Sequence, residues 1–156
     1  MAKVKRWLKW LDKWEYTWLC LLVVITLAAH FSIINQPKQV VFDEVYYVNE
    51  ARSILADNGT LRPEHPPVGK LFVVAGIALF GDNPVGWRFF SIICGTGCII
   101  LFYLICRQLA MSKRASVLAT FLLALENMSF VQAGVAMLDV YSLVLMLASF
   151  WLMKEE

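Results

Sequence analysis

The sequence contains a long uncharged apolar run near its N-terminus, "WLCLLVVITLAAHFSII" at residues 18–34. No Asp, Glu, Lys or Arg interrupts this run, and it is about long enough for a helix to cross a bilayer. A cleaved signal peptide is the rival interpretation. The length of the run, with no clear small-x-small cleavage site after it, favours a membrane-spanning helix.

The overall composition agrees with a membrane protein. Of the 156 residues, 60% are hydrophobic and 17% are charged, whereas soluble domains have about 45–50% apolar and about 25% charged residues. The basic residues form no stripe on a folded domain, so nucleic acid is not an expected partner. The cysteines all lie in apolar stretches, where a disulfide framework is not expected: Cys20, Cys94, Cys98 and Cys106. Cys94 and Cys98, four residues apart, could share a helix face, and we expect them to be small packing side chains rather than metal ligands.

Charge placement gives a predicted topology. Residues 1–17 form a basic, Trp-rich amphipathic segment, which the positive-inside rule assigns to the cytoplasmic side. Residues 35–83 then form an external loop. Further spans are predicted at about 84–106, 115–132 and 136–153. The predicted fold is an all-α integral membrane module of about four transmembrane helices over residues 18–156, with short membrane-surface helices in the loop.

The external loop contains its own structural signals. A short helix is predicted after residue 42, with Asp43 as its N-cap and Gly59 at its end. The prolines of "TLRPEHPPVGK" forbid a regular helix there. Residues 68–81 are apolar but too short to span, so we expect them to lie flat on the membrane. In "DNPVGW", Asn83 and Pro84 start the next helix.

The adjacent acids Asp43 and Glu44 are the first candidate site residues. Capping of the loop helix and complementarity to its dipole would explain one acid. An adjacent pair at the membrane–water boundary allows another role. One carboxylate could act as general base on a hydroxyl while the other holds a partner or a cation.

Other polar side chains are expected on the same external side. Lys70 and Arg88 are candidates for contact with a phosphate, although basic residues also anchor at headgroup level, and His65 is either a further candidate or a loop histidine with no role. Ionisable groups at membrane depth usually face a cavity, with solvation at the interface as the alternative. The polar residues of the last apolar stretch fall in this class: Glu126, Asn127 and Asp139.

Four stretches occur in a characteristic order: "FDEVYYVNEA", "HPPVGK", "GWRF" and "LALENMSFVQAGVAMLDVYSL". Together they resemble the protein O-mannosyltransferases, and more broadly the GT-C membrane glycosyltransferases that use polyprenyl-phosphate sugars. The resemblance covers about residues 18–153. It implies transfer of mannose from a dolichyl- or polyprenyl-phosphate carrier to Ser or Thr hydroxyls of a protein, with inversion at the sugar carbon.

The resemblance also implies residue roles. Asp43 would be the general base and Glu44 its support, while the donor and its phosphate would be bound by a polar set: His65, Lys70, Arg88, Glu126, Asn127 and Asp139. The implied partners are the lipid-linked donor, a protein acceptor and the membrane. We predict no metal site and no cofactor besides the donor. A divalent cation stays open, because metal dependence in this family is not uniform.

Members of the resembled family have many more spans than this chain. We therefore expect a truncated protein or one part of a larger enzyme, with a second chain supplying spans and little activity alone. The alternatives are a non-catalytic membrane subunit or remnant, and a related transferase that acts on lipids or glycans. The expected location is a bacterial or archaeal plasma membrane, or the endoplasmic reticulum.

Overall fold

The computed structural model describes residues 14–153, so the predicted basic segment at residues 1–17 lies almost wholly outside the described residues. The described part is helical and contains no strand, which confirms the predicted all-α class. Its helices are α2 (Glu15–Ile33), α3 (Glu44–Leu55), α4 (Pro67–Phe80), α5 (Pro84–Gln108), α6 (Lys113–Ala124), α7 (Asn127–Ala133) and α8 (Leu138–Leu152).

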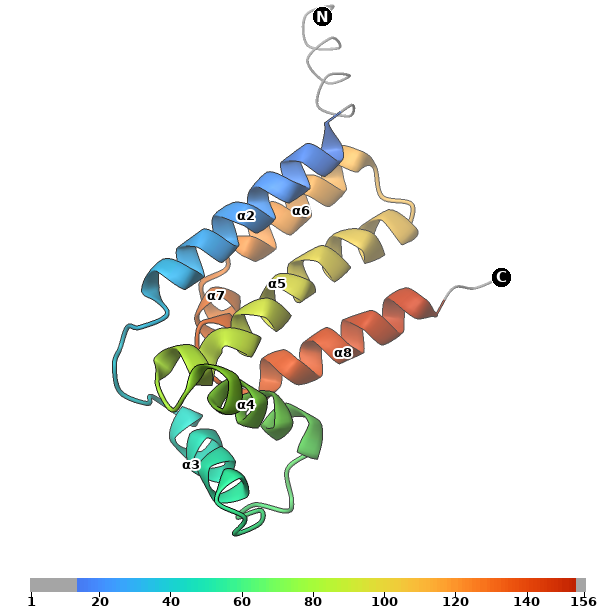
Figure 1. The fold of residues 1–156 in the computed structure, drawn as a ribbon. Helices are drawn as coiled ribbons and strands as arrows, with labels where there is room; N and C mark the ends of the chain where they lie inside the picture. The colour runs from blue at the N-terminus through green and yellow to red at the C-terminus, as the bar shows by residue number, and fades with distance from the viewer. Residues whose placement is uncertain (1–13, 154–156) are drawn as a thin grey trace, which may run out of the picture.

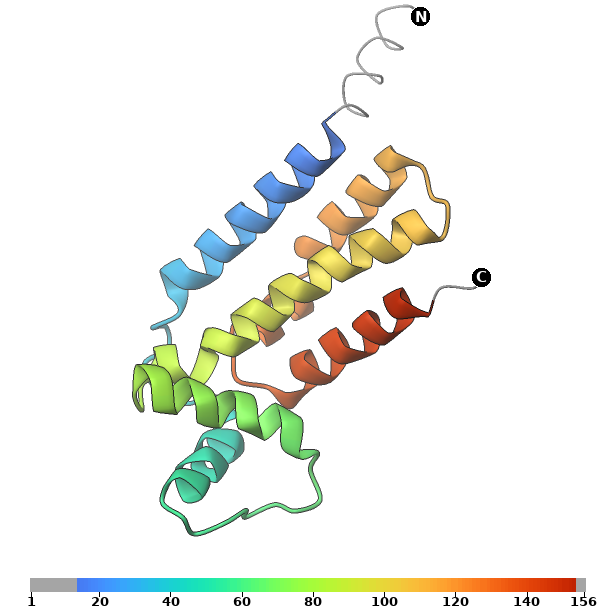
Figure 2. The same ribbon diagram turned by 45° about the vertical axis from the view of Figure 1, so that its right-hand side comes forward.

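The helices form a bundle with a separate layer at one end. Figures 1 and 2 show α2, α5, α6 and α8 running alongside one another, with α4 lying across one end and α3 beyond it. Helix α5 is central, because it packs against α2, α4, α6, α7 and α8. The layer of α3 and α4 contains most of the loop that was predicted to be external.

Two helices are long and apolar enough to cross a membrane, α2 and α5. Helices α6 and α7 are long and apolar enough to cross a membrane only when they are taken together as one broken span, with a bend of 61° between them. Helix α8 has 15 residues, fewer than the roughly 20 that a perpendicular span requires. The described residues thus contain two candidate spans, or three with the bent pair, and the four-span topology stays a prediction.

Local sequence signals set some helix ends and not others. Asn83 caps α5 as predicted, since its side chain accepts hydrogen bonds from the Val85 and Gly86 amides at 3.0 and 3.3 Å. Helix α3, by contrast, ends at Leu55 and not at Gly59. Asp57 makes the left-handed turn there, with φ of 59°, because Asp tolerates this conformation better than most residues.

Helices α4 and α5 approach each other at the level of the backbone. A Cβ atom on Gly76 would lie 2.0 Å from the Gly86 carbonyl oxygen, and one on Gly86 would lie 2.1 Å from that of Gly81. Only residues without a side chain fit this crossing. The flat segment predicted at 68–81 is therefore a helix that is fixed across the end of α5 by main-chain contact.

Candidate active site

A buried ion pair lies where the α3–α4 layer meets the bundle. Arg88 is fully buried, and its Nε and Nη2 donate to Glu44 Oε1 and Oε2 at 2.9 and 2.8 Å. The same guanidinium donates to the carbonyl oxygens of Ile34, Pro37 and Gln39 at 3.0, 2.8 and 3.1 Å. Arg88 thus fastens the connection between α2 and α3 to α5.

Glu44 has further partners of its own. Its carboxylate accepts hydrogen bonds from the backbone amides of Val41, at 3.1 Å, and Ala136, at 3.0 Å. Burying an ion pair costs desolvation energy, which is offset only when the remaining donors and acceptors are also satisfied. Here they are satisfied by main-chain groups, and Glu44 joins the start of α3 to the turn before α8.

A second buried ion pair holds the irregular loop against α3. Lys70 Nζ lies 2.9 Å from Glu50 Oε1, and both side chains are at most 5% exposed. Glu50 also accepts from the Thr60 hydroxyl and the Leu61 and Arg62 amides. Burial raises the pKa of Glu50, but the hydrogen bonds from Thr60 and Lys70 more than offset it and bring the pKa to about 2.

Asp43 lies beside these ion pairs but outside them. It precedes α3 with helical backbone angles, φ −72° and ψ −8°, and its side chain makes no capping hydrogen bond. The predicted capping by Asp43 is therefore wrong, and the backward contact to a loop amide comes from Glu44 instead. The Asp43 side chain is exposed, which leaves its carboxylate accessible.

Tyr47 is the centre of a group of polar side chains around Asp43. Its ring contacts His65 edge to face, with centroids 5.9 Å apart. Burial raises the pKa of Tyr47, and the negative charges of Asp43 and Asp139 raise it further, while Arg62 opposes them. We call Tyr47, the ring that contacts it and the charges that act on it the Tyr47 group: Asp43, Tyr47, Arg62, His65 and Asp139.

The Tyr47 group contains three of the predicted site residues, Asp43, His65 and Asp139, and two that the sequence reading missed. Tyr47 could have been found from its position four residues after Asp43, which places both on one side of a helix. Arg62 gave no such signal, because it lies in an irregular loop. Its guanidinium lies over the ring of Tyr46, 4.1 Å from the centroid.

Lys70 and Arg88 do not present free cations to this group. Both are buried and bound to carboxylates. Glu126 and Asn127 lie at the break between α6 and α7, where Glu126 caps α7 through the Met128 and Ser129 amides. Helix α7 packs on α5, α6 and α8, whereas α3 packs mainly on α4. The two residues thus lie at the break between α6 and α7, whereas Asp43 and Tyr47 lie at the start of α3.

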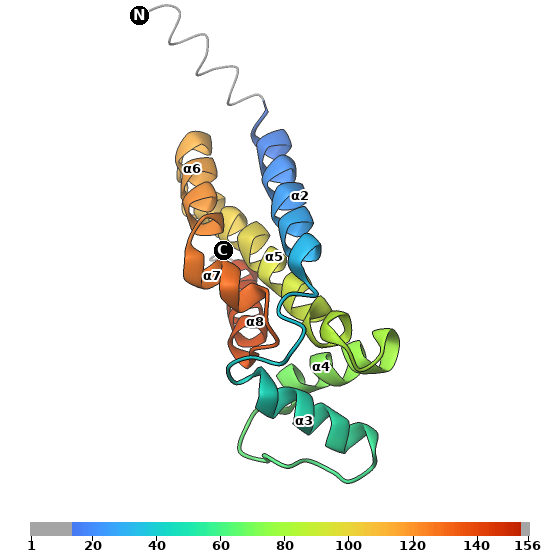
Figure 3. The same cartoon turned by 90° about the vertical axis from the view of Figure 1, so that its left-hand side faces the viewer.

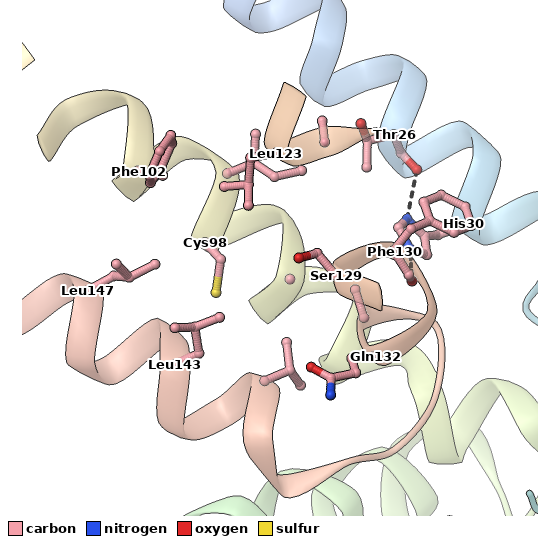
Figure 4. A pocket seen from close by; sticks show the side chains of 15 residues that line it. Thr26, His30, Cys98, Phe102, Leu123, Ser129, Phe130, Gln132, Leu143 and Leu147 are labelled. Carbon is pink, nitrogen blue, oxygen red and sulfur yellow. Dashed lines mark hydrogen bonds between the residues drawn. The ribbon is translucent and has the colours of Figure 1, made fainter. Parts of the chain in front are cut away.

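A mostly apolar cavity of about 150 Å³ lies among the bundle helices (Figure 4). Leu143 and Leu147 of α8 contribute to its wall. At its edge, His30 bridges α2 to α7, with its ring nitrogens 2.9 Å from Thr26 O and 3.0 Å from Phe130 O. With so few polar groups, this cavity offers packing space rather than a reactive centre.

Metal ligands are not gathered in the described residues. Between residues 14 and 153, no group of three or more His, Cys, Asp or Glu side chains could hold a metal ion. The four cysteines have free thiols, and Cys94, Cys98 and Cys106 are buried along α5. Their burial agrees with the packing role expected from the sequence.

The fold and the site define a helical membrane protein with a polar layer, bearing exposed carboxylates, at one end of its bundle. Comparison with known families identifies the family. The model of the dolichyl-phosphate-mannose-protein mannosyltransferases matches residues 20–87 and 80–155. The chain belongs to this family.

Individual relatives agree with this assignment. A polyprenol-phosphate-mannose–protein mannosyltransferase of Mycolicibacterium smegmatis is 31% identical over 144 residues, which cover 85% of this chain and 28% of the relative. Dolichyl-phosphate-mannose–protein mannosyltransferase 1 of Candida albicans is 31% identical over 143 residues, which cover 80% of this chain and 16% of the relative. The chain thus spans less than a third of the length of these relatives, and no solved structure matches it.

Proposed function

We propose that this chain carries the acidic surface layer of a membrane mannosyltransferase active site. The donor is a polyprenyl- or dolichyl-phosphate mannose and the acceptor is a protein, as the names of the relatives suggest. The accepting group is a Ser or Thr hydroxyl, as the resemblance of the sequence motifs implies. The observation that carries the proposal is the exposed Asp43 next to the fully engaged Glu44. The layer faces the extracytoplasmic side, and the N-terminus is cytoplasmic.

In the proposed reaction Asp43 takes the proton of the acceptor hydroxyl. The hydroxyl oxygen then forms a bond to the anomeric carbon while the bond from that carbon to the phosphate oxygen breaks. The carrier phosphate leaves with the electron pair, and this single displacement inverts the anomeric centre. A hydroxyl needs such a base within hydrogen-bond reach, because its own proton is lost only at high pH.

Asp43 suits this role because it is exposed while its position is fixed. Its neighbour Glu44 is held by Arg88 and by two backbone amides, so the start of α3 cannot shift without breaking buried hydrogen bonds. Rigid placement of a base is a large part of its catalytic value. Glu44 and Arg88 are thus positioning residues in this proposal.

The leaving phosphate requires positive charge or hydrogen-bond donors, and we assign these roles to Arg62 and His65. These two members of the Tyr47 group lie on the accessible loop, whereas Lys70 and Arg88 are already paired with carboxylates. Cationic and hydrogen-bond-donating groups stabilise the charge that develops on the leaving oxygen. We assign Asp139 as the second carboxylate of the proposed site, with a role in binding sugar hydroxyls; its charge acts on Tyr47 and it is exposed.

The test compares Asp43→Asn with Asp57→Asn, because Asp57 is an exposed acid at the other end of the same helix. Transfer of labelled mannose from polyprenyl phosphate to a Ser/Thr-rich peptide is measured in membranes that contain the full-length protein, or the complex that supplies the remaining spans. We expect Asp43→Asn to lower kcat about 10²- to 10⁴-fold with little change in KM, and Asp57→Asn to be neutral.

Thermal unfolding of both variants serves as the control. We expect both to stay within about 0.5 kcal/mol of the parent protein, as exposed substitutions usually do. Normal transfer by Asp43→Asn would refute the assignment of the base. Transfer to a lipid or glycan but not to the peptide would favour the related class of transferase, and no transfer by the parent protein would favour a non-catalytic subunit.

A further inference from the structure

The turn that leads into α3 contains a residue in a conformation that its type disfavours. The connection from α2 to α3 ends in this turn (Figure 3), where the Glu44 amide donates to the Val41 carbonyl oxygen at 3.0 Å. Phe42 has φ of 49°, and Asp43 has φ of −72° and ψ of −8°. A turn with positive φ only at its first central residue is of type II′, and glycine dominates that position. Here the position holds a phenylalanine.

Two other non-glycine residues between residues 14 and 153 have a positive φ, and both have an ordinary reason for it. Asp57 and Ala110, with φ of 59° and 58°, each follow the last turn of a helix, where a left-handed residue commonly ends the helical pattern. Phe42 precedes a helix, so this reason does not apply to it. A bulky residue at positive φ is strained, and such strain persists where the surroundings over-determine it, often at functional sites.

The surroundings of Phe42 hold the turn firmly while leaving its ring outside. The Val41 amide donates to Glu44 Oε2 at 3.1 Å, and the same carboxylate is bound by Arg88 and by the Ala136 amide. The main chain on both sides of Phe42 is thus tied to the buried Glu44. The Phe42 side chain gains little burial in return, because it is 75% exposed. Strain combined with exposure indicates that this ring contacts a molecule or segment other than the described residues.

We propose that Phe42 contacts the acceptor protein beside its reactive Ser or Thr. This inference rests on the proposed function, because it takes the adjacent Asp43 as the base. In a single displacement the attacking hydroxyl and the leaving phosphate lie on opposite sides of the anomeric carbon. The neighbour of the base therefore belongs to the acceptor side, whereas Arg62 and His65 are assigned to the phosphate. Aromatic side chains are enriched where proteins contact one another, and an exposed apolar ring selects acceptors with an apolar residue next to the hydroxyl.

The first test measures mannose transfer to two peptides, one with a leucine and one with a glycine beside the acceptor threonine. The full-length protein, or the complex that supplies the remaining spans, is assayed in membranes. We expect the parent protein to have the lower KM for the leucine peptide. Phe42→Asn should raise that KM about 5- to 10-fold with kcat unchanged, which removes the preference. Phe42→Tyr keeps the ring and should stay within about twofold of the parent protein.

Ala110→Asn is the matched control, because Ala110 is also exposed at positive φ but follows the far end of α5. Asn tolerates this conformation, so we expect neither Asn variant to lower the temperature of unfolding. We expect the control to keep the KM of the parent protein. A lower unfolding temperature for Phe42→Asn alone would show that the ring packs within the protein. A raised KM for the donor and not for the peptide would show that the ring contacts the sugar. Either result would overturn the proposal.

A second test requires no turnover. The photoreactive amino acid p-benzoylphenylalanine, placed at position 42 of the same protein, forms a covalent bond on irradiation with whatever lies next to the ring. We expect cross-links to the leucine peptide. Cross-links only to membrane lipid, or only within the protein, would overturn the proposal. If Asp43→Asn is inactive and the peptide is not cross-linked, this inference alone fails, whereas normal transfer by Asp43→Asn refutes the proposed function itself.

Discussion

Both ends of the helical bundle place a buried carboxylate among cations, but the two clusters are built differently. At the α3 end, Glu44 and Arg88 are both fully buried and bound to main-chain groups as well. At the opposite end, Glu15 is buried while its partner Lys113 is 43% exposed. The first cluster fixes the path of the chain, whereas the second holds cations at a surface. Burial of the cation distinguishes the two.

The largest difference is expected on removal of the cations. Arg88→Met leaves Glu44 buried without its counter-charge, and breaking such a pair typically costs about 3–5 kcal/mol. Lys113→Met removes a half-exposed partner, for which about 1 kcal/mol or less is expected. Both losses are measured as the difference in unfolding free energy between each variant and the parent protein in detergent micelles. Equal losses for the two variants would contradict the distinction between the clusters.

The pH dependence of the Glu50–Lys70 pair should be the next largest effect. Because the pKa of Glu50 falls from 4.5 to about 2 on folding, the ionised pair stabilises the protein above pH 4.5. That contribution decreases as the pH falls towards 2, and is about 3 kcal/mol at most. The unfolding free energy of the parent protein and of Glu50→Gln, measured between pH 7 and 3, should converge as the pH falls. Parallel curves would exclude this linkage.

The smallest effect is expected at Arg52. Its guanidinium donates twice to Asp82, at 2.7 and 3.0 Å, but both side chains are more than 40% exposed. Exposed pairs are typically worth about 1 kcal/mol or less and are screened by salt. We expect Arg52→Gln to lower the unfolding free energy by that amount at low salt and by less in 0.5 M NaCl. A loss of unfolding free energy as large as that of Arg88→Met would show that solvent exposure does not determine how much each ion pair stabilises the protein.

The sequence was sufficient to predict the helical class, the first long apolar helix and the start of α5. These features depend on local signals, namely an uncharged apolar run and the Asn-Pro pair at residues 83–84. The end of α3 was not predicted, because Asp57 adopts the left-handed turn that Gly59 could equally provide. The number of spans was not settled by composition, since α6 and α7 bend where Glu126 caps a new helix.

The sequence indicated which residues are candidates for the site, but it did not indicate which of them are buried and which are exposed. Asp43 and Glu44 are identical in kind and adjacent in sequence, yet one is exposed and the other is fully buried. The difference depends on Arg88, which is 44 residues away, and on the amide of Ala136, which is 92 residues away. A backbone amide has no sequence signature, so this contact required the fold.

The contact between Gly76 and Gly86 has a consequence for where the α3–α4 layer lies relative to the bundle. Because main-chain atoms of α4 and α5 touch there, the inclination of α4 to α5 is set without any adjustable side chain. A methyl group at either position would separate the two helices and move the α3–α4 layer away from the bundle. The distance of Asp43 from the bundle is thus fixed by two residues that have no side chain.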